Sequence, residues 1–156
     1  MGNPKKLSAS LEDYLEAIYL ICRERGEARS KEIMEHLRVT GPSVTEAFLL
    51  LHDKGLINYS PYEAITLTSS GRAIAGEVLR RHEALRGFFI EVLQVDWKTA
   101  DLGACQMEHV ASPNIIDRMI RYTQYMREQC HSRGRERRHC FAEYLQGKQP
   151  ELFDNE

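Results

Sequence analysis

The stretch SKEIMEHLRVTGPSVTEAFLLLHDKG, residues 30–55, decides the fold. Its first part predicts a short helix capped by Ser30, because a serine at a helix start accepts hydrogen bonds from free backbone N–H groups. A turn through residues 39–41 follows, and Pro42 then stands at the first helical position, which proline favours. This helix is expected to stop at Gly55. Two short helices joined by a tight turn are typical of a helix-turn-helix.

The second helix of such a pair enters the major groove of DNA, and basic side chains nearby contact phosphates. Its inward apolar residues are predicted to be Val44, Phe48, Leu49 and Leu51. The candidate DNA-binding residues are Arg29, Lys31, Pro42, Ser43, Thr45 and Glu46. For the basic residues among them, an ordinary solvated surface is an equally good interpretation.

The flanking segments predict one more helix and a wing. Residues 8–25 carry apolar side chains at the spacing of an amphipathic helix, and Gly26 ends it. Residues 56–59 and 64–68 alternate β-prone side chains around a Ser-Pro-Tyr-Glu turn, which indicates a hairpin. A hairpin directly after a helix-turn-helix is a wing.

The rest of the chain is predicted to be helical. A long helix starts at Ser69-Ser70-Gly71 and runs to about Val92, and shorter ones cover about 97–110 and 112–126. We therefore expect a mainly α protein: a winged helix-turn-helix DNA-binding domain over residues 1–70, then an all-helical dimerisation and metal-binding domain over 71–127. Residues 128–156 are expected to form a charged tail with a short helix around 135–145.

Composition describes an ordinary globular chain of 156 residues with a net charge of −2. No apolar run approaches the roughly 20 residues that span a bilayer, so we expect no membrane partner. The first residues lack the apolar stretch of a signal peptide, which predicts a cytoplasmic protein. Four irregularly spaced cysteines in such a chain favour thiols or metal ligands over disulfides.

Metal-binding side chains cluster at Cys105, Glu108 and His109, which share one face of a helical turn at i, i+3 and i+4. Taken alone, this triplet is more often a core cysteine with a solvated glutamate and a packed histidine. Asp13 and Glu16 form a similar i, i+3 pair on the first predicted helix. Only the combination of these groups favours a metal site.

The chain resembles the diphtheria toxin repressor and manganese transport regulator family, in order and without large gaps, from about residue 8 to residue 126. The matching pieces are Asp13-Tyr14-Leu15-Glu16-Ala17-Ile18-Tyr19, Ser43-Val44-Thr45, Leu67-Thr68-Ser69-Ser70-Gly71, Arg81-His82-Glu83 and Cys105-x-x-Glu108-His109. The resemblance implies a short member without the C-terminal SH3-like domain that long iron-type members carry.

The resemblance also implies a homodimeric, metal-dependent regulator, most simply a repressor of iron or manganese homeostasis genes that binds a palindromic double-stranded DNA operator. The implied co-repressor is Fe(II) or Mn(II), with Co(II), Ni(II) or Zn(II) as substitutes. Manganese-selective members have a glutamate in place of Cys105, and iron-type members have a methionine in place of Asp13, so this site is a hybrid. The implied metal ligands are Asp13, Glu16, His82, Cys105, Glu108 and His109.

Two alternatives and one additional site remain beside this interpretation. A winged-helix regulator that senses a small organic ligand or thiol oxidation has the same fold, although no small organic substrate is expected here. A metal-dependent hydrolase is disfavoured, because no nucleophile motif or phosphate loop is present, so we predict that the protein is not an enzyme. A second, tetrahedral metal site is a further hypothesis for the tail residues Cys130, His131, His139 and Cys140.

Overall fold

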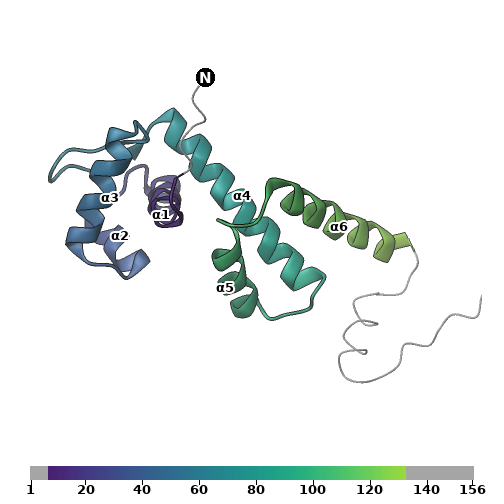
Figure 1. Cartoon of the computed structure of the whole chain (residues 1–156). Coiled ribbons are helices and arrows are strands. Elements are labelled where there is room, and N and C mark those ends of the chain that lie inside the picture. The colour runs from purple at the N-terminus through teal and green to yellow at the C-terminus, as the bar shows by residue number, and fades with distance from the viewer. Residues whose placement is uncertain (1–6, 133–156) are drawn as a thin grey trace, which may run out of the picture. The chain divides into compact units, whose positions relative to one another are not determined.

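The computed structural model describes residues 7–132, with side chains up to residue 128, and this part of the chain is mainly helical, as predicted (Figure 1). Its elements in order are α1 (Ala9–Arg25), α2 (Ser30–Leu37), α3 (Gly41–Asp53), β1 (Ile57–Asn58), β2 (Thr66–Leu67), α4 (Ser69–Glu91), α5 (Trp97–Met107) and α6 (Pro113–Ser132).

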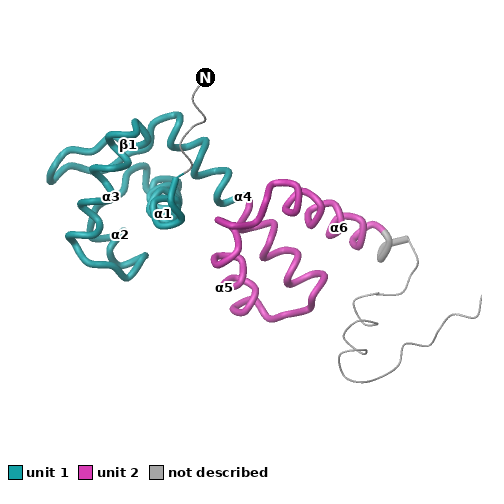
Figure 2. Tube along the Cα trace, viewed as in Figure 1, with its two compact units in different colours: residues 1–80 teal, residues 81–156 magenta. Residues whose placement is uncertain are grey.

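The chain divides into two compact units, residues 1–80 and residues 81–156 (Figure 2). Unit 1 holds α1, α2, α3 and the hairpin, and unit 2 holds α5 and α6. Helix α4 contributes its first half to unit 1 and its second half to unit 2. The domain limits expected from the sequence, at 70 and 127, stay predictions.

The core of unit 1 forms where the three helices and the hairpin bury their apolar faces. Leu15 and Ile18 of α1, Ile33 of α2 and Phe48 of α3 are fully buried in one hydrophobic cluster. Full burial of one such side chain stabilises the fold by about 1.5–3 kcal/mol. The prediction for Leu49 was wrong, since its side chain is 51% exposed.

Helix α3 buries a smaller residue where Leu49 was expected. Ala47 is buried beside Val44 and Leu51, because positions 44, 47, 48 and 51 follow the i, i+3, i+4, i+7 stripe of a helix. Leu49 lies off that stripe. The size of an apolar side chain was a poorer guide to burial than its helical phase.

The start of α2 also differs from the sequence prediction. Ser30 is the first helical residue, and the capping position before it is occupied by Arg29. The Glu32 carboxylate accepts a hydrogen bond from the Arg29 backbone N–H at 2.9 Å. A glutamate in the first turn therefore satisfies the N–H of the capping residue itself, whereas a serine cap would accept from N–H groups inside the first turn.

The predicted wing is present, with shorter strands than the sequence indicated. Ile57 pairs with Leu67 and Asn58 with Thr66 in antiparallel register. Thr68 forms hydrogen bonds at the base of the wing. Its hydroxyl donates to the carbonyl of Gly55, just after α3, at 2.8 Å, and accepts from the N–H of Gly71, in the first turn of α4, at 3.1 Å.

The core of unit 2 is smaller. Leu85 of α4, Ala104 of α5 and Ile116 of α6 are fully buried against each other. Helix α6 continues to Ser132, six residues beyond the predicted end at Met126. The sequence between Pro113 and Gly134 contains no glycine or proline that would end a helix. The many charged residues after Met126 were therefore a poor reason to predict the end of the helix there. None of the helices in the described residues combines the length and apolar character that a bilayer span needs.

Candidate metal centre

The candidate centre in unit 2 is built around Glu108, the residue that follows the last residue of α5. Its backbone keeps helical angles and its N–H donates to the Ala104 carbonyl at 2.9 Å. The Glu108 side chain is fully buried, which is rare for a carboxylate unless it is paired or binds a cation. The local fold therefore places a negative charge in a buried position.

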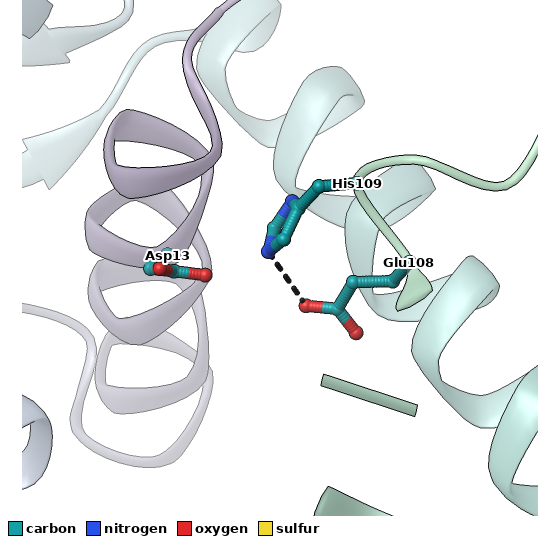
Figure 3. Close-up of side chains that lie close together, drawn as sticks. All are labelled: Asp13, Glu108 and His109. Carbon is teal, nitrogen blue, oxygen red and sulfur yellow. Dashed lines mark ion pairs between the residues drawn. The ribbon is translucent and has the colours of Figure 1, made fainter. Parts of the chain in front are cut away.

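Two imidazoles flank this carboxylate. His82, in the middle of α4, lies with Nδ1 2.6 Å from Glu108 Oε2. His109 forms an ion pair whose Nε2 lies 3.2 Å from Oε1 (Figure 3). Both histidine side chains are largely buried, with exposed fractions of 13% and 10%. The sequence placed these three residues in one site, and within unit 2 the structure brings them together.

The surroundings of the Glu108 carboxylate suit a divalent transition metal. Among the described residues, no group donates a hydrogen bond to its buried Oε1 atom. The His109 ring lies 3.2 Å from this atom, and coordination to a cation would supply the partner that a hydrogen bond does not. Carboxylate oxygen and imidazole nitrogen are also donors that Mn(II), Fe(II) and Zn(II) accept.

The other face of His82 contacts residues that the sequence did not single out. Asp101 Oδ1, on α5, lies 3.0 Å from His82 Nε2 and accepts from Arg86 Nη1 at 3.0 Å. Burial raises the pKa of Asp101, but hydrogen bonds from Arg86 and His82 outweigh it, so the pKa lies below the usual value. Asp101 therefore stays ionised at neutral pH.

Helical spacing is the sequence signal that could have pointed to Arg86 and Asp101 as neighbours of the site. Arg86 lies one turn after His82 on α4, and Asp101 lies one turn before Cys105 on α5. Arg86 and Asp101 are 15 residues apart in the sequence, so no local motif predicts their contact.

Cys105 differs from these buried residues in its exposure to solvent. Its side chain is exposed, whereas Glu108, one turn later, is fully buried. Helix α5 ends at Met107, so His109 lies in the turn that follows the helix. The single helical face proposed for the three residues from the sequence is thus interrupted after Glu108.

The remaining two predicted ligands belong to unit 1. Asp13 and Glu16 are half-buried on α1, one helical turn apart. Ser8 caps this helix by accepting from the Leu11 N–H, and Leu15 and Ile18 fix its apolar face in the core of unit 1. The rigid helix therefore carries both carboxylates as a pair.

The predicted DNA-binding residues are all exposed in unit 1. Pro42, Ser43, Thr45 and Glu46 line the solvent side of the first turns of α3, and Arg29 and Lys31 lie at the start of α2. The Thr45 hydroxyl donates to the Gly41 carbonyl at 3.1 Å, and the Ser43 and Thr40 hydroxyls are 3.2 Å apart.

The hypothetical second metal site falls outside the described side chains. Cys130 and His131 lie in the last turns of α6, where the structure describes only the backbone, and His139 and Cys140 lie beyond residue 132.

Comparison with known proteins assigns a family to both parts of the chain. Residues 6–65 match the model described as iron dependent repressor, N-terminal DNA binding domain. Residues 68–135 match iron dependent repressor, metal binding and dimerisation domain. An uncharacterized HTH-type transcriptional regulator of Methanocaldococcus jannaschii is 39% identical over 114 residues, which cover 72% of this chain and 91% of that protein. The chain belongs to the iron-dependent repressor family.

Further members support this assignment. The HTH-type transcriptional regulator MntR of Bacillus subtilis is 36% identical over 76% of this chain and 83% of its own length. A solved structure described as a manganese-dependent transcriptional repressor complex with manganese has a TM-score of 0.67 and 27% identity over 74% of this chain. The chain spans about half of that protein, since the match covers 53% of it.

Family membership confirms the predicted protein class. The iron-dependent repressors are metal-dependent DNA-binding transcriptional regulators, and they are not enzymes. The predicted fold class, a winged helix-turn-helix followed by a helical dimerisation and metal-binding domain, is confirmed by the same matches and by the described helices. DNA and a second copy of the chain are therefore partners of this repressor family member.

Proposed function

We propose that this protein is a cytoplasmic repressor of metal homeostasis genes, and that its co-repressor is Fe(II) or Mn(II). The relative from Bacillus subtilis carries the name MntR, and one similar solved repressor is described as manganese-dependent. The proposed ligands are Asp13, Glu16, His82, Glu108 and His109, with Cys105 as a sixth donor.

The observation that carries this proposal is the burial of Glu108 between two imidazoles. The buried Oε1 atom accepts no hydrogen bond of good geometry from the described residues and has the His109 ring 3.2 Å away, which favours a cation beside it. His82 and His109 place imidazole nitrogens on either side of it. Ligands of this mixture suit first-row divalent metals and exclude Ca²⁺ and Mg²⁺ as preferred ions.

The switch follows from the charges on α1. Asp13 and Glu16 together carry two negative charges, and Glu108 carries a third, so the carboxylates repel one another when they approach. A bound divalent ion supplies the positive charge that turns this repulsion into attraction. Asp13 and Glu16 would lose freedom of movement when they bind the ion, and with them α1, which shares the core of unit 1 with α3. Metal binding would thereby favour some placements of α3 over others.

DNA recognition is proposed to use two copies of α3 on a palindromic operator. Ser43 and Thr45 offer hydroxyls to bases or phosphates, and Arg29 and Lys31 offer positive charge to the backbone. Two copies are proposed to meet through the apolar groove of unit 2, because a second copy would bury side chains that solvent now reaches. This groove is lined by Phe88, Ile115, Arg118, Met119 and Tyr122.

The test is a DNA-retention assay with chelator-stripped protein, titrated anaerobically with Fe(II), Mn(II) and Zn(II). We expect retention of operator DNA at micromolar Fe(II) or Mn(II) and its loss in the double variant Glu108→Gln, His109→Gln. Glu83→Gln is the matched control, because Glu83 is an exposed carboxylate next to His82. DNA binding that ignores both metal and the double variant would overturn the proposal and favour an organic-ligand or redox sensor.

A further inference from the structure

Beyond the proposed ligands, a chain of contacts in unit 2 ends on His82. Arg86 lies 5.7 Å from the centre of the Trp97 ring in a cation–π contact, and it donates to Asp101 at 3.0 Å. The same Asp101 oxygen lies 3.0 Å from His82 Nε2. His82 and Arg86 are one turn apart on α4, and Asp101 and Trp97 are one turn apart on α5. The network thus consists of two residues from α4 and two from α5.

The two nitrogens of His82 have different partners, and this difference matters for metal binding. A neutral imidazole carries one N–H and one lone pair, so a histidine that binds metal through one nitrogen must carry its proton on the other. Each nitrogen faces a carboxylate oxygen, Nε2 that of Asp101 at 3.0 Å and Nδ1 that of Glu108 at 2.6 Å, and Arg86 Nη1 lies 3.5 Å from Nε2. If a cation binds between Nδ1 and Glu108, the Asp101 carboxylate is the acceptor that remains for the ring proton, which would then stay on Nε2.

Arg86 fixes the orientation of Asp101. Its guanidinium is always charged and donates to the oxygen that faces His82. The exposed fractions are 30% for Arg86 and 34% for Asp101, so solvent only partly screens the pair. The Trp97 ring lies 5.7 Å from the guanidinium, so Arg86 contacts a second residue of α5 besides Asp101.

We propose that Asp101 and Arg86 are positioning residues of the metal centre, which hold His82 in the tautomer that binds metal through Nδ1. This inference rests on the proposed function, because it needs the metal centre to exist. Asp101 itself is not a ligand in this arrangement, since its inner oxygen is shared by Arg86 and His82. Carboxylates that hold metal-binding histidines in this way typically change metal affinity by about 10- to 100-fold when removed.

The experiment measures Mn(II) affinity of the full chain by competition with a fluorescent chelator, for wild type, Asp101→Ala, Asp101→Asn, Asp101→Glu and Arg86→Met. We expect about 10- to 100-fold weaker binding for Asp101→Ala and Asp101→Asn, a smaller loss for Arg86→Met, and partial recovery for Asp101→Glu. Asp117→Asn is the matched control, because Asp117 is an exposed, arginine-paired aspartate on α6. It should leave affinity unchanged.

A second measurement separates positioning from a merely structural role. In the Zn(II)-loaded protein, ¹H–¹⁵N NMR of the histidine rings should show a protected Nε2–H on His82, which a His82→Asn spectrum assigns. This signal should vanish in Asp101→Ala while the thermal midpoint of the metal-free protein stays near that of wild type. An unchanged ring signal with unchanged Mn(II) affinity in both Asp101→Ala and Asp101→Asn would overturn the inference.

The outcome for Glu108→Gln distinguishes this inference from the proposed function. If Glu108→Gln loses Mn(II) binding and Asp101→Ala keeps it, the metal centre stands and the positioning role fails. If wild type and Glu108→Gln bind Mn(II) equally, or neither binds it, both the centre and the positioning role are overturned.

Discussion

Glu108 Oε2 lies 2.6 Å from His82 Nδ1, and this contact joins the end of α5 to the middle of α4 within unit 2. A cation at this carboxylate is expected to stabilise the folded protein, because a ligand that binds only the folded state shifts the unfolding equilibrium. At a free Mn(II) concentration of about 100 times Kd the gain is about 2.7 kcal/mol.

The first prediction concerns metal and heat. Adding Mn(II) to chelator-stripped protein should raise Tm by about 5–10 °C, measured by differential scanning calorimetry. The Glu108→Gln variant should lose most of this shift, and the exposed control Glu83→Gln should keep it. An equal shift in all three proteins would mean that Mn(II) stabilises the chain from another place.

A second prediction tests the packing at the base of the wing. A Cβ atom at Gly71 would stand 1.9 Å from the Leu56 carbonyl oxygen, so the backbone must move to accept it. Gly71→Ala is expected to lower the free energy of unfolding by about 3 kcal/mol or more.

Gly76 on the same helix is the matched control for Gly71. Nothing lies within 4 Å of a Cβ there, and alanine is the better helix former. Gly76→Ala should therefore raise stability by up to about 1 kcal/mol. Urea unfolding of the two variants measures both effects, and equal effects of the two substitutions would contradict the close approach at Gly71.

The third prediction compares the reactivity of two cysteines. Burial raises the pKa of the Cys22 thiol, which also donates to the Ile65 carbonyl at 3.6 Å, whereas Cys105 is exposed. Only the thiolate is reactive, so iodoacetamide at pH 8 should modify Cys105 well before Cys22. Peptide mapping by mass spectrometry reads each site separately.

The raised pKa of Cys22 also sets a pH dependence of stability. Because the folded-state pKa lies above the unfolded value of about 8.5, the folded state holds the proton more tightly. The Cys22 thiol contributes fully to the free energy of unfolding below the unfolded-state pKa. This contribution is lost as the pH rises through the folded-state pKa. Cys22→Ala should flatten the fall of stability above about pH 8.5, and modification of Cys22 as fast as Cys105 would contradict this account.

Alkylation with and without metal also tests Cys105 as the sixth ligand. A thiolate bound to metal is protected from alkylation, so Zn(II) should slow the modification of Cys105 in wild type but not in Glu108→Gln. An unchanged rate with Zn(II) would remove Cys105 from the ligand set and leave the five other donors.

The fourth prediction concerns the start of α2 and DNA. Lys31 is highly exposed, and its Nζ lies 3.9 Å from a Glu35 carboxylate oxygen. If it contacts a phosphate, Lys31→Ala lowers the slope of log affinity against log salt by about one per subunit. Lys98→Ala, an exposed lysine of unit 2, is the control. Fluorescence anisotropy with operator DNA over a salt series measures both slopes, and identical slopes would exclude Lys31 as a phosphate contact.

The sequence predicted the elements well where periodicity and caps agree. The α2–α3 pair follows from its apolar stripe, Pro42 and the turn at residues 39–41, all of which are local signals. Errors arose where size or charge was used in place of helical phase, as for Leu49 on α3 and for the end of α6.

The candidate site was partly predictable for a related reason. Glu108 and His109 are neighbours in sequence, and the resemblance to metal regulators added His82 from a distant helix. Asp101 and Arg86 were missed because their contacts with His82 and with each other depend on how α4 and α5 pack. Residue spacing in the sequence does not predict that packing. The role that we propose for them rests on the distances from the two nitrogens of His82.

The buried carboxylate of Glu108 has a consequence for the lifetime of the protein in the cell. Its Oε1 atom accepts no hydrogen bond from the described residues, so if a cation binds there, unit 2 would open more often without metal than with it. Proteases cleave proteins through such open states. Metal starvation would then both release the operator and shorten the survival of the repressor, so that its abundance as well as its DNA occupancy follows the metal supply.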